Sequence, residues 1–244
     1  MTVAINPSDT AFKAVCGPFG IVDVANSRFA HADAAVAQYA CGEEVAGEGD
    51  PAENYFMVAK GVFRSVKVTR DGRRQIFAFY MPGDMCGLEP GPSYDLTIEA
   101  VNAASIAILS RSACRARMAR DPQFNSAVFD GATRALALSI DHMTMVGRSS
   151  AEERLAWFLK MLRDRASIPG RVPVTVELVM QRQDIADYLG LTIETVSRTF
   201  THMKERGFIA LPTTRRVELL NPTAIERLAS ADRDAPAWDR CICA

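Results

Sequence analysis

One segment of the chain predicts a specific motif: residues 182–200 are RQDIADYLGLTIETVSRTF. Apolar residues recur at helical spacing on both sides of a central turn. The apolar faces are Ile185, Ala186 and Leu189 in the first helix and Val196, Phe200 and Met203 in the second. Gly190 supplies the turn, and Thr192 is a suitable N-cap for the second helix. Two short helices joined by a turn that contains Gly predict a helix-turn-helix.

The outer face of the second helix carries Glu194, Ser197 and Arg198. Glu194 and Arg198 are four residues apart and therefore lie on the same side of the helix. A guanidinium can donate twice to guanine, a carboxylate can accept from the cytosine amino group, and a hydroxyl can do either. We predict that these three residues read base edges in a major groove. The alternative is an ordinary ion pair on a solvated helix face.

Other polar residues are placed to donate to DNA phosphates, because helix N-termini attract anions. Downstream, residues 207–211 and 216–220 flank a Pro-Thr-Thr-Arg turn and predict a β-hairpin wing with a basic tip. The predicted phosphate-binding residues are Gln181, Arg182, Thr192, Thr195, Arg215 and Arg216.

A strongly amphipathic helix is predicted at 151–165, upstream of the motif. Its buried stripe consists of Leu155, Phe158, Leu159 and Leu162. Ser149 or Ser150 can cap this helix, and acidic residues in its first turn favour the helix dipole. Gly147 and Arg148 resemble a hinge, which places a domain boundary near residue 147.

A second, longer helix is predicted from Asp121-Pro122 to Gly147, a stretch without turn signals. Residues spaced alternately four and three apart form one seam along it, which is typical of a two-helix interface. The predicted dimer interface is Phe124, Val128, Gly131, Ala135, Leu138, His142 and Met145. The alternative is an amphipathic helix that packs on its own domain.

Short β-branched and aromatic runs separated by turns occupy the region before this helix. The runs are 55–58, 62–68, 75–80 and 105–109, and Asp71-Gly72 is a hairpin signal. This pattern is typical of an antiparallel roll or sandwich. The fold class is therefore α+β: an N-terminal β-roll, a long dimerisation helix and a C-terminal winged helix-turn-helix.

Composition limits the other possibilities. The 244 residues carry 28 Lys+Arg against 29 Asp+Glu, for a net charge of −1, so any nucleic-acid site must be local. No basic segment followed by an apolar core opens the chain, and no stretch is apolar enough to span a membrane, which predicts a cytoplasmic protein. Phosphate-binding glycine loops, HExxH pairs and nucleophile elbows are missing from the sequence, so we do not expect an enzyme.

The arrangement resembles the CRP/FNR superfamily, and most closely its FixK-type branch. The matching segments are DGRRQIFAFYMPGDMCGLE at 71–89, HMTMVGRSSAEERLAWFL at 142–159 and LTIETVSRTF at 191–200. Together with the order of roll, long helix and helix-turn-helix, the resemblance covers roughly residues 29–230. It implies a jelly roll like that of cyclic-nucleotide-binding domains, a long dimerisation helix and a winged helix that binds DNA.

The resemblance also implies an operator. Glu194, Ser197 and Arg198 match the E-x-x-S-R pattern by which the FNR and FixK branches read TTGAT-type half-sites in an inverted repeat. Ile193 stands where the cyclic-AMP receptor branch has an arginine, which favours the FNR/FixK type of operator. The family implies a homodimer on palindromic double-stranded DNA, an activator, and RNA polymerase as a further partner.

The effector region departs from the cyclic-AMP branch. The Gly87-Leu-Glu89 step preserves part of a nucleotide-binding loop, but the following residues supply no arginine for a cyclic phosphate. Cys16 alone stands where the FNR type has a cysteine cluster, and no histidine accompanies Cys86 as in the haem-binding branch. We therefore expect no cofactor and no metal.

The alternative is a sensor whose DNA binding is switched by a ligand or thiol in the roll. The region concerned is Gly83, Cys86, Gly87, Glu89 and Cys114.

The predicted domain plan has five parts. These are an N-terminal arm at 1–28, the sensor-like roll at 29–121, the dimerisation helix at 122–147, the winged helix-turn-helix at 148–230 and a flexible tail at 231–244.

Overall fold

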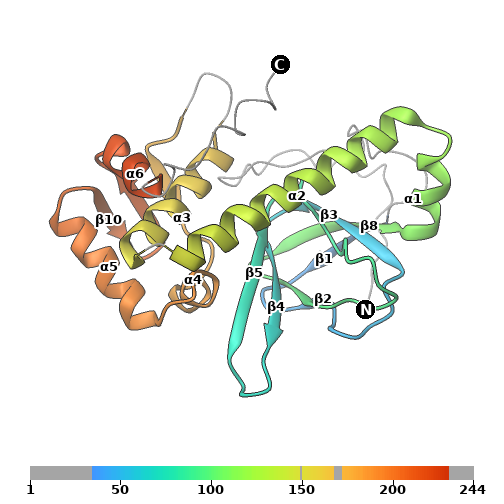
Figure 1. Cartoon of the computed structure of the whole chain (residues 1–244), viewed down its shortest axis with the longest axis horizontal. Helices are drawn as coiled ribbons and strands as arrows, with labels where there is room; N and C mark the ends of the chain where they lie inside the picture. Colours follow the sequence, from blue (N-terminus) through green and yellow to red (C-terminus); the bar gives the residue numbers. More distant parts are fainter. Residues whose placement is uncertain (1–34, 149, 168–171, 231–244) are drawn as a thin grey trace. The chain divides into compact units, whose positions relative to one another are not determined.

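The computed structural model describes residues 35–148, 150–167 and 172–230, and the predicted arm at 1–28 and tail at 231–244 lie outside this part of the chain. The chain divides into two compact units between Ile140 and Asp141. Figure 1 shows strands gathered in the first unit and most helices in the second. The predicted fold class is confirmed: a β-roll, a long helix and a winged helix-turn-helix follow one another along the chain.

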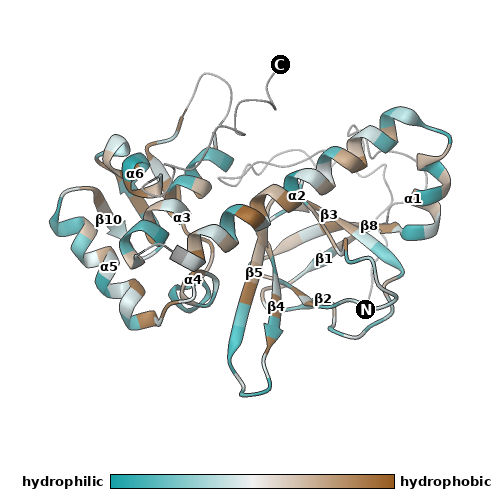
Figure 2. Cartoon of the chain, in the orientation of Figure 1, coloured by the Kyte–Doolittle hydropathy of each residue, from teal (hydrophilic) through white to brown (hydrophobic). Residues whose placement is uncertain are grey.

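The first unit is built around two antiparallel four-stranded sheets, ordered β1-β8-β3-β6 and β2-β7-β4-β5. Its strands are β1 (Ala35–Tyr39), β2 (Glu44–Ala46), β3 (Asn54–Lys60), β4 (Phe63–Val68), β5 (Arg74–Tyr80), β6 (Met85–Cys86), β7 (Thr97–Ala100) and β8 (Ala104–Ser110). The hairpin predicted at Asp71-Gly72 joins β4 to β5, and Gly72 has the positive φ of 79° that such a turn requires. Its tip is hydrophilic, as the teal colour in Figure 2 shows.

Large side chains fill the interior of the roll. Phe56 and Tyr94 pack with their rings 5.7 Å apart, and Cys86 lies in the same cluster of buried residues. The Tyr94 hydroxyl donates to the Asn54 carbonyl at 2.8 Å and accepts from the Asn54 N–H at 3.2 Å. The polar end of Tyr94 is therefore satisfied although its ring is buried.

Two helices pack on the outside of the first sheet. They are α1 (Arg111–Met118), which no sequence pattern predicted, and the long α2 (Pro122–Arg148). Phe124 and Val128 of α2 pack with Cys114 of α1 against Met57 and Ala107 of the sheet. This apolar layer fixes the first turns of α2 on the roll.

The chain itself buries both ends of the predicted dimer seam on α2. Phe124 and Val128 are buried in the layer just described, and His142 and Met145 are buried in the second unit. Between them Gly131 lies against Met85, and Ala135 and Leu138 are half-buried. The chain itself therefore covers most of the face that the spacing assigns to a partner.

A different apolar stripe on α2 is exposed. Its members are Phe129, Leu136, Ile140 and Met143, with 66%, 60%, 41% and 65% of their surfaces exposed. At about 100° per residue this stripe lies on the opposite side of the helix from the predicted seam. Both stripes follow spacings of three, four and seven, so periodicity alone could not decide between them.

The second unit contains the last turns of α2 and the rest of the chain. Its elements are α3 (Ala151–Arg165), β9 (Thr175–Glu177), α4 (Arg182–Leu189), α5 (Ile193–Glu205), β10 (Ile209–Thr213), β11 (Arg216–Leu219) and α6 (Pro222–Ala229). The predicted bounds of α3 are confirmed, and Ser150 is its cap: the Glu153 N–H donates to the Ser150 hydroxyl, and the Ser150 N–H donates to the Glu153 carboxylate. The buried stripe of α3 is fully enclosed.

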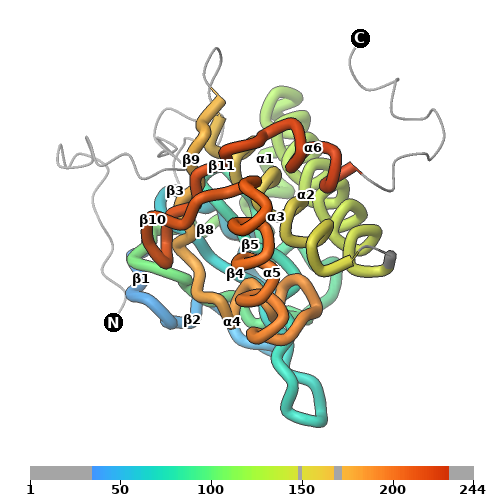
Figure 3. Tube along the Cα trace, turned by 90° about the vertical axis from the view of Figure 1, so that its left-hand side faces the viewer, coloured from blue at the N-terminus to red at the C-terminus, as the bar shows by residue number. Residues whose placement is uncertain are grey.

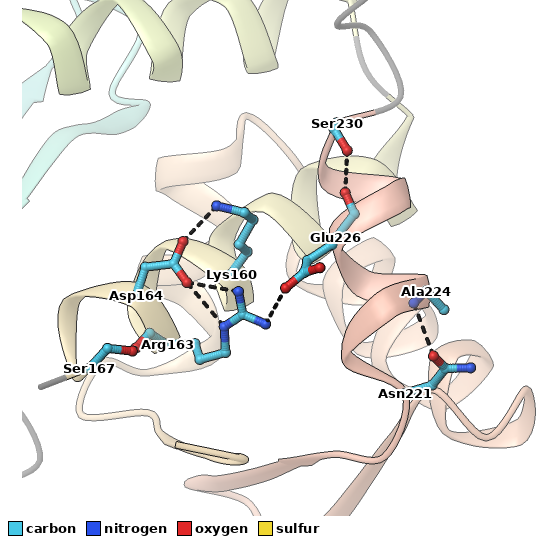
Figure 4. A network of polar contacts seen from close by, with 8 residues as sticks. All are labelled: Lys160, Arg163, Asp164, Ser167, Asn221, Ala224, Glu226 and Ser230. Carbon is cyan, nitrogen blue, oxygen red and sulfur yellow. Dashed lines mark hydrogen bonds and ion pairs between the residues drawn. The ribbon is translucent and has the colours of Figure 1, made fainter. Parts of the chain in front are cut away.

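Figure 4 shows the polar network that holds α6 against α3. Arg163 is only 6% exposed, and it pairs with Glu226 of α6 at 2.9 Å and with Asp164 at 2.8 Å. Lys160 pairs with the other oxygen of Asp164 at 2.6 Å. Because a buried guanidinium needs acceptors on each side, this network fixes the position of α6 in the unit.

None of the helices in the described part of the chain combines the length and apolar composition that crossing a bilayer requires.

Candidate DNA-binding interface

The predicted helix-turn-helix is confirmed by α4 and α5. Asp184 accepts a hydrogen bond from the Gln181 N–H at 3.2 Å, which caps the start of α4. Gly190 ends the helix with φ 63° and ψ 39°, a left-handed conformation that L side chains avoid. Thr192 then caps α5 by accepting from the Thr195 N–H at 3.2 Å. Figure 3 shows α4 and α5 next to each other, with α3 behind α5.

The apolar faces of α4 and α5 are packed together. Ile185, Ala186, Leu189, Val196, Phe200 and Met203 are each at most 1% exposed. The apolar side of α5 is therefore buried as its amphipathic pattern predicts, and the opposite side of the helix faces solvent. That solvent-facing side holds Glu194, Ser197 and Arg198, which are all exposed.

The Glu194 side chain is a carboxylate anion at neutral pH. Its own backbone N–H, the Thr192 hydroxyl and the positive charge of Arg198 hold the pKa of this carboxyl below its usual value of 4.5. Because the carboxylate is fully exposed, it can exchange solvent for a base donor. Glu194 and Arg198 thus present an acceptor and a donor on one helix side, separated by one turn.

Most of the predicted phosphate-binding residues are exposed. Gln181, Thr192, Arg215 and Arg216 are exposed, and Thr195 is half-exposed. The predicted wing is formed by β10 and β11, with β9 as a third antiparallel strand at the outer side of β11. The Arg215 carbonyl accepts from the Leu178 N–H at 2.7 Å, so the backbone of the wing turn is held while its side chains remain in solvent.

Arg182 has a different environment from the one expected. Its guanidinium lies 3.4 Å from the centroid of the Phe200 ring, so that it stacks between α4 and α5. Its Nη1 atom is buried without a hydrogen-bond partner among the described residues, and burial lowers the pKa of this side chain to about 10. Arg182 therefore has a packing role in the motif that sequence reasoning missed.

Two further side chains hold the motif from outside. Arg154 of α3 donates to the Leu189 carbonyl at 2.9 Å, and His142 of α2 lies 2.7 Å from the Tyr188 carbonyl through Nε2. No sequence signal indicated either contact, because both partners are far away along the chain.

The loop of the predicted effector region packs closely against the interior of the roll. Gly83 and Gly87 adopt positive φ values of 92° and 71° in their turns, and a Cβ on Gly87 would lie 2.9 Å from Phe56. Arg111 donates to the carbonyls of Gly87 and Gly91 at 2.8 and 3.1 Å. The loop is thus tied to the start of α1 by the chain's own arginine.

The two candidate redox cysteines are not brought together. Cys86 belongs to the interior cluster of the roll, and Cys114 belongs to the layer between the sheet and the outer helices. Burial raises the pKa of both thiols, and nearby carboxylates raise that of Cys86 further. Neither environment favours the reactive thiolate.

Comparison with known proteins assigns the two units. Residues 36–121 match the family model of the cyclic nucleotide-binding domain, and residues 153–228 match that of the Crp-like helix-turn-helix domain. The chain is 43% identical over 195 residues to the nitrogen fixation regulation protein FixK of Azorhizobium caulinodans, which covers 80% of this chain and 79% of that protein. It is 38% identical over 227 residues to the FixK protein of Bradyrhizobium diazoefficiens, covering 92% and 94%.

A solved structure shows the same fold. FixK2 from Bradyrhizobium japonicum superposes with a TM-score of 0.74 at 37% sequence identity, over 84% of this chain and all of that one (100%).

The turn at Gly190 yields a stability prediction. Gly190→Ala places a Cβ on a left-handed residue, and we expect it to lower the free energy of unfolding by about 1–2 kcal/mol. Gly147→Ala is the matched control, since Gly147 is helical and a Cβ there meets nothing within 4 Å. Urea unfolding followed by circular dichroism measures both. Equal effects of the two substitutions would contradict the role of the turn.

Proposed function

The chain belongs to the CRP/FNR family of transcription regulators as a FixK-type member, and on that premise we propose which DNA it binds and how. It binds, as a homodimer in the cytoplasm, an operator of two TTGAT-type half-sites in inverted repeat, and it acts as an activator. The observation that carries this proposal is the exposed trio Glu194, Ser197 and Arg198 on the outer side of α5.

Base recognition follows from the chemistry of that trio. The Arg198 guanidinium suits the O6 and N7 acceptors of guanine, and the Glu194 carboxylate suits the amino group of cytosine. The positive charge of Arg198 also contributes to the lowered pKa of Glu194, so the two side chains present opposite charges to the groove. A carboxylate next to the groove further disfavours sequences that present only acceptors, because like charges and lone pairs repel.

Phosphate contacts position the recognition helix. Thr192 and Thr195 lie at the N-terminus of α5, where backbone N–H groups and the helix dipole attract a phosphate. Arg215 and Arg216 lie on the exposed turn of the wing. Together they supply the local positive potential that the net charge of −1 does not.

The dimer forms through the exposed stripe of α2, Phe129, Leu136, Ile140 and Met143. Four large apolar side chains on one helix face are unusual on a monomer surface, and two copies of the stripe can cover each other as a coiled coil. Two-fold symmetry then matches the two-fold symmetry of an inverted repeat.

DNA binding requires no cyclic nucleotide. The loop after β6 lacks an arginine for a cyclic phosphate. Phe56 and Tyr94 fill the interior of the roll beside this loop. Arg111 already donates hydrogen bonds to the carbonyls of Gly87 and Gly91. These observations support a regulator that binds DNA without an effector. RNA polymerase is the partner that activation would need.

One observation favours an effector-dependent alternative. Oε2 of Glu89, in the same loop, is buried and has no hydrogen-bond partner among the described residues. A polar ligand that donates to this oxygen would satisfy it. Operator binding with and without cyclic nucleotides separates the two functions.

The proposal predicts specific binding by the untreated protein. In fluorescence anisotropy at about 150 mM salt, we expect a TTGAT/ATCAA inverted repeat to be bound at least about a thousandfold more tightly than a scrambled duplex. Cyclic AMP and cyclic GMP should leave both affinities unchanged. Specific binding that appears only after a nucleotide is added would instead support the effector-dependent alternative.

Arg198 and Arg215 have separable roles in the proposal. Arg198→Ala should cost about 1–3 kcal/mol on the operator and little on scrambled DNA, because it removes a contact to a base. Arg215→Ala should weaken both duplexes alike and reduce the slope of affinity against salt, because it removes a phosphate contact. Equal losses on the two duplexes for both variants would contradict this division.

Leu136 tests the dimer interface. Leu136→Glu puts a charge in the exposed stripe of α2, and we expect a monomer in light scattering with a loss of operator binding. Arg134→Glu is the control, since Arg134 is also exposed on α2 but lies outside the stripe. A Leu136→Glu variant that remains dimeric would show that the dimer forms elsewhere.

A further inference from the structure

The carbonyl end of α4 is capped by side chains from two other helices. The last carbonyls of a helix have no partner within it and need donors from elsewhere. At the end of α4, Arg154 of α3 donates to the Leu189 carbonyl at 2.9 Å and to the Gly190 carbonyl at 3.4 Å. His142 of α2 takes the preceding carbonyl, that of Tyr188, at 2.7 Å. The turn between α4 and α5 is therefore held from outside the motif.

His142 is locked in place by its surroundings. Its ring stacks on the Tyr188 ring at a centroid distance of 4.0 Å and an angle of 3°, and the Trp157 ring of α3 lies 6.3 Å away at an angle of 28°. Because the partner of Nε2 is a carbonyl oxygen, Nε2 must carry the proton and donate it. Only 8% of the His142 surface is exposed.

His142 also connects the motif to the face proposed for dimerisation. Its neighbour Met143 is 65% exposed in the apolar stripe of α2, whereas His142 lies on the other side of the helix. The last turns of α2, from Asp141, belong to the same compact unit as α3 to α6. One helical turn thus carries a residue for the partner subunit and a residue that contacts α4.

We propose that His142 is a positioning residue for DNA binding. By stacking on Tyr188 and donating to its carbonyl, His142 fixes the orientation of α4, and through Gly190 that of the recognition helix α5, on the end of the dimer-forming helix. This inference rests on the proposed function. It replaces the sequence-based assignment of His142 to the dimer interface.

The site responds to pH. Burial lowers the pKa of His142 below its usual value of 6.5, against the opposing effect of its hydrogen bond to Tyr188. The folded protein therefore binds this proton at a lower pH than the unfolded chain does. The stability of the site is complete above pH 6.5 and is lost as pH falls from 6.5 through the lower folded value.

Other charged groups lie around the stack. Asp141 of α2 and Arg165 of α3 act on the Tyr188 hydroxyl, and burial raises the pKa of that hydroxyl so that it stays protonated. Arg154 of α3 donates to the neighbouring carbonyl, that of Leu189. Within the stack of His142, Tyr188 and Trp157, the histidine is the group that gains a charge as pH falls below 6.5.

The test compares His142→Leu and His142→Gln with the wild type. At pH 7.5 the leucine variant should bind the inverted-repeat operator about tenfold more weakly, roughly the value of one net hydrogen bond, while circular dichroism and light scattering show a folded dimer. The glutamine variant should recover most of the affinity, because its amide N–H can donate to the Tyr188 carbonyl. Thr144→Ala, on an exposed face of the same turn, is the control and should bind like the wild type.

A second readout does not depend on DNA. In a Trp238→Phe background, the fluorescence of Trp157 should fall as pH drops through a value below 6.5, because a charged imidazole quenches a neighbouring indole. Neither His142 variant should show this transition. Operator affinity of the wild type should decline over the same pH range relative to that of His142→Gln, which keeps the comparison valid if the leucine variant does not fold.

The possible outcomes separate the proposed function from the positioning role of His142. A wild-type protein that shows no preference for the operator would overturn the proposed function and the positioning role with it. A wild type that binds specifically, combined with a folded His142→Leu dimer of equal affinity, would overturn the positioning role alone. The same conclusion follows if the wild type and His142→Gln share one pH dependence of affinity.

Discussion

The left-handed turn at Gly190 is the constraint on which the arrangement of the second unit depends. It ends α4 and turns the chain within a few residues, so that α5 begins at Ile193. The apolar faces of the two helices are then in contact, and Phe200 and Leu189 are both buried. Arg182 stacks across this contact on the Phe200 ring, and Arg154 donates to the carbonyls on the other side of the turn. With the inner side of α5 occupied in this way, its outer side, including Arg198, is the side left for DNA.

The helices α3, α4 and α5 of the second unit could be predicted closely from sequence because their signals are local. Caps at Ser150 and Thr192 and the glycine at 190 lie within a few residues of the helices they bound, and α3 begins and ends where the pattern predicts. The short strands β1, β2, β6, β7 and β9 and the helices α1 and α6 were not predicted. The strands are too short to show a sustained apolar period, and pairing with distant strands, as between β1 and β8, determines their structure.

The buried face of α2 could not be predicted from the sequence. The helix has apolar residues on two opposite sides, and both stripes have the spacing of a two-helix interface. Which stripe remains exposed depends on what else the chain packs against the helix. Met57 and Ala107 of the sheet cover Val128, and Tyr188 of α4 covers His142. Such contacts join residues far apart in sequence, so no local pattern reveals them.

The outer side of α5 was predictable for the opposite reason, because no other part of the described chain covers Glu194, Ser197 and Arg198. The central claim, that this side reads an inverted repeat as a dimer, is tested most directly by selecting bound duplexes from a randomised pool. We predict enrichment of two copies of one half-site in inverted orientation, with centres about one helical turn apart. Enrichment of a single unpaired site, or of no sequence at all, would contradict the claim.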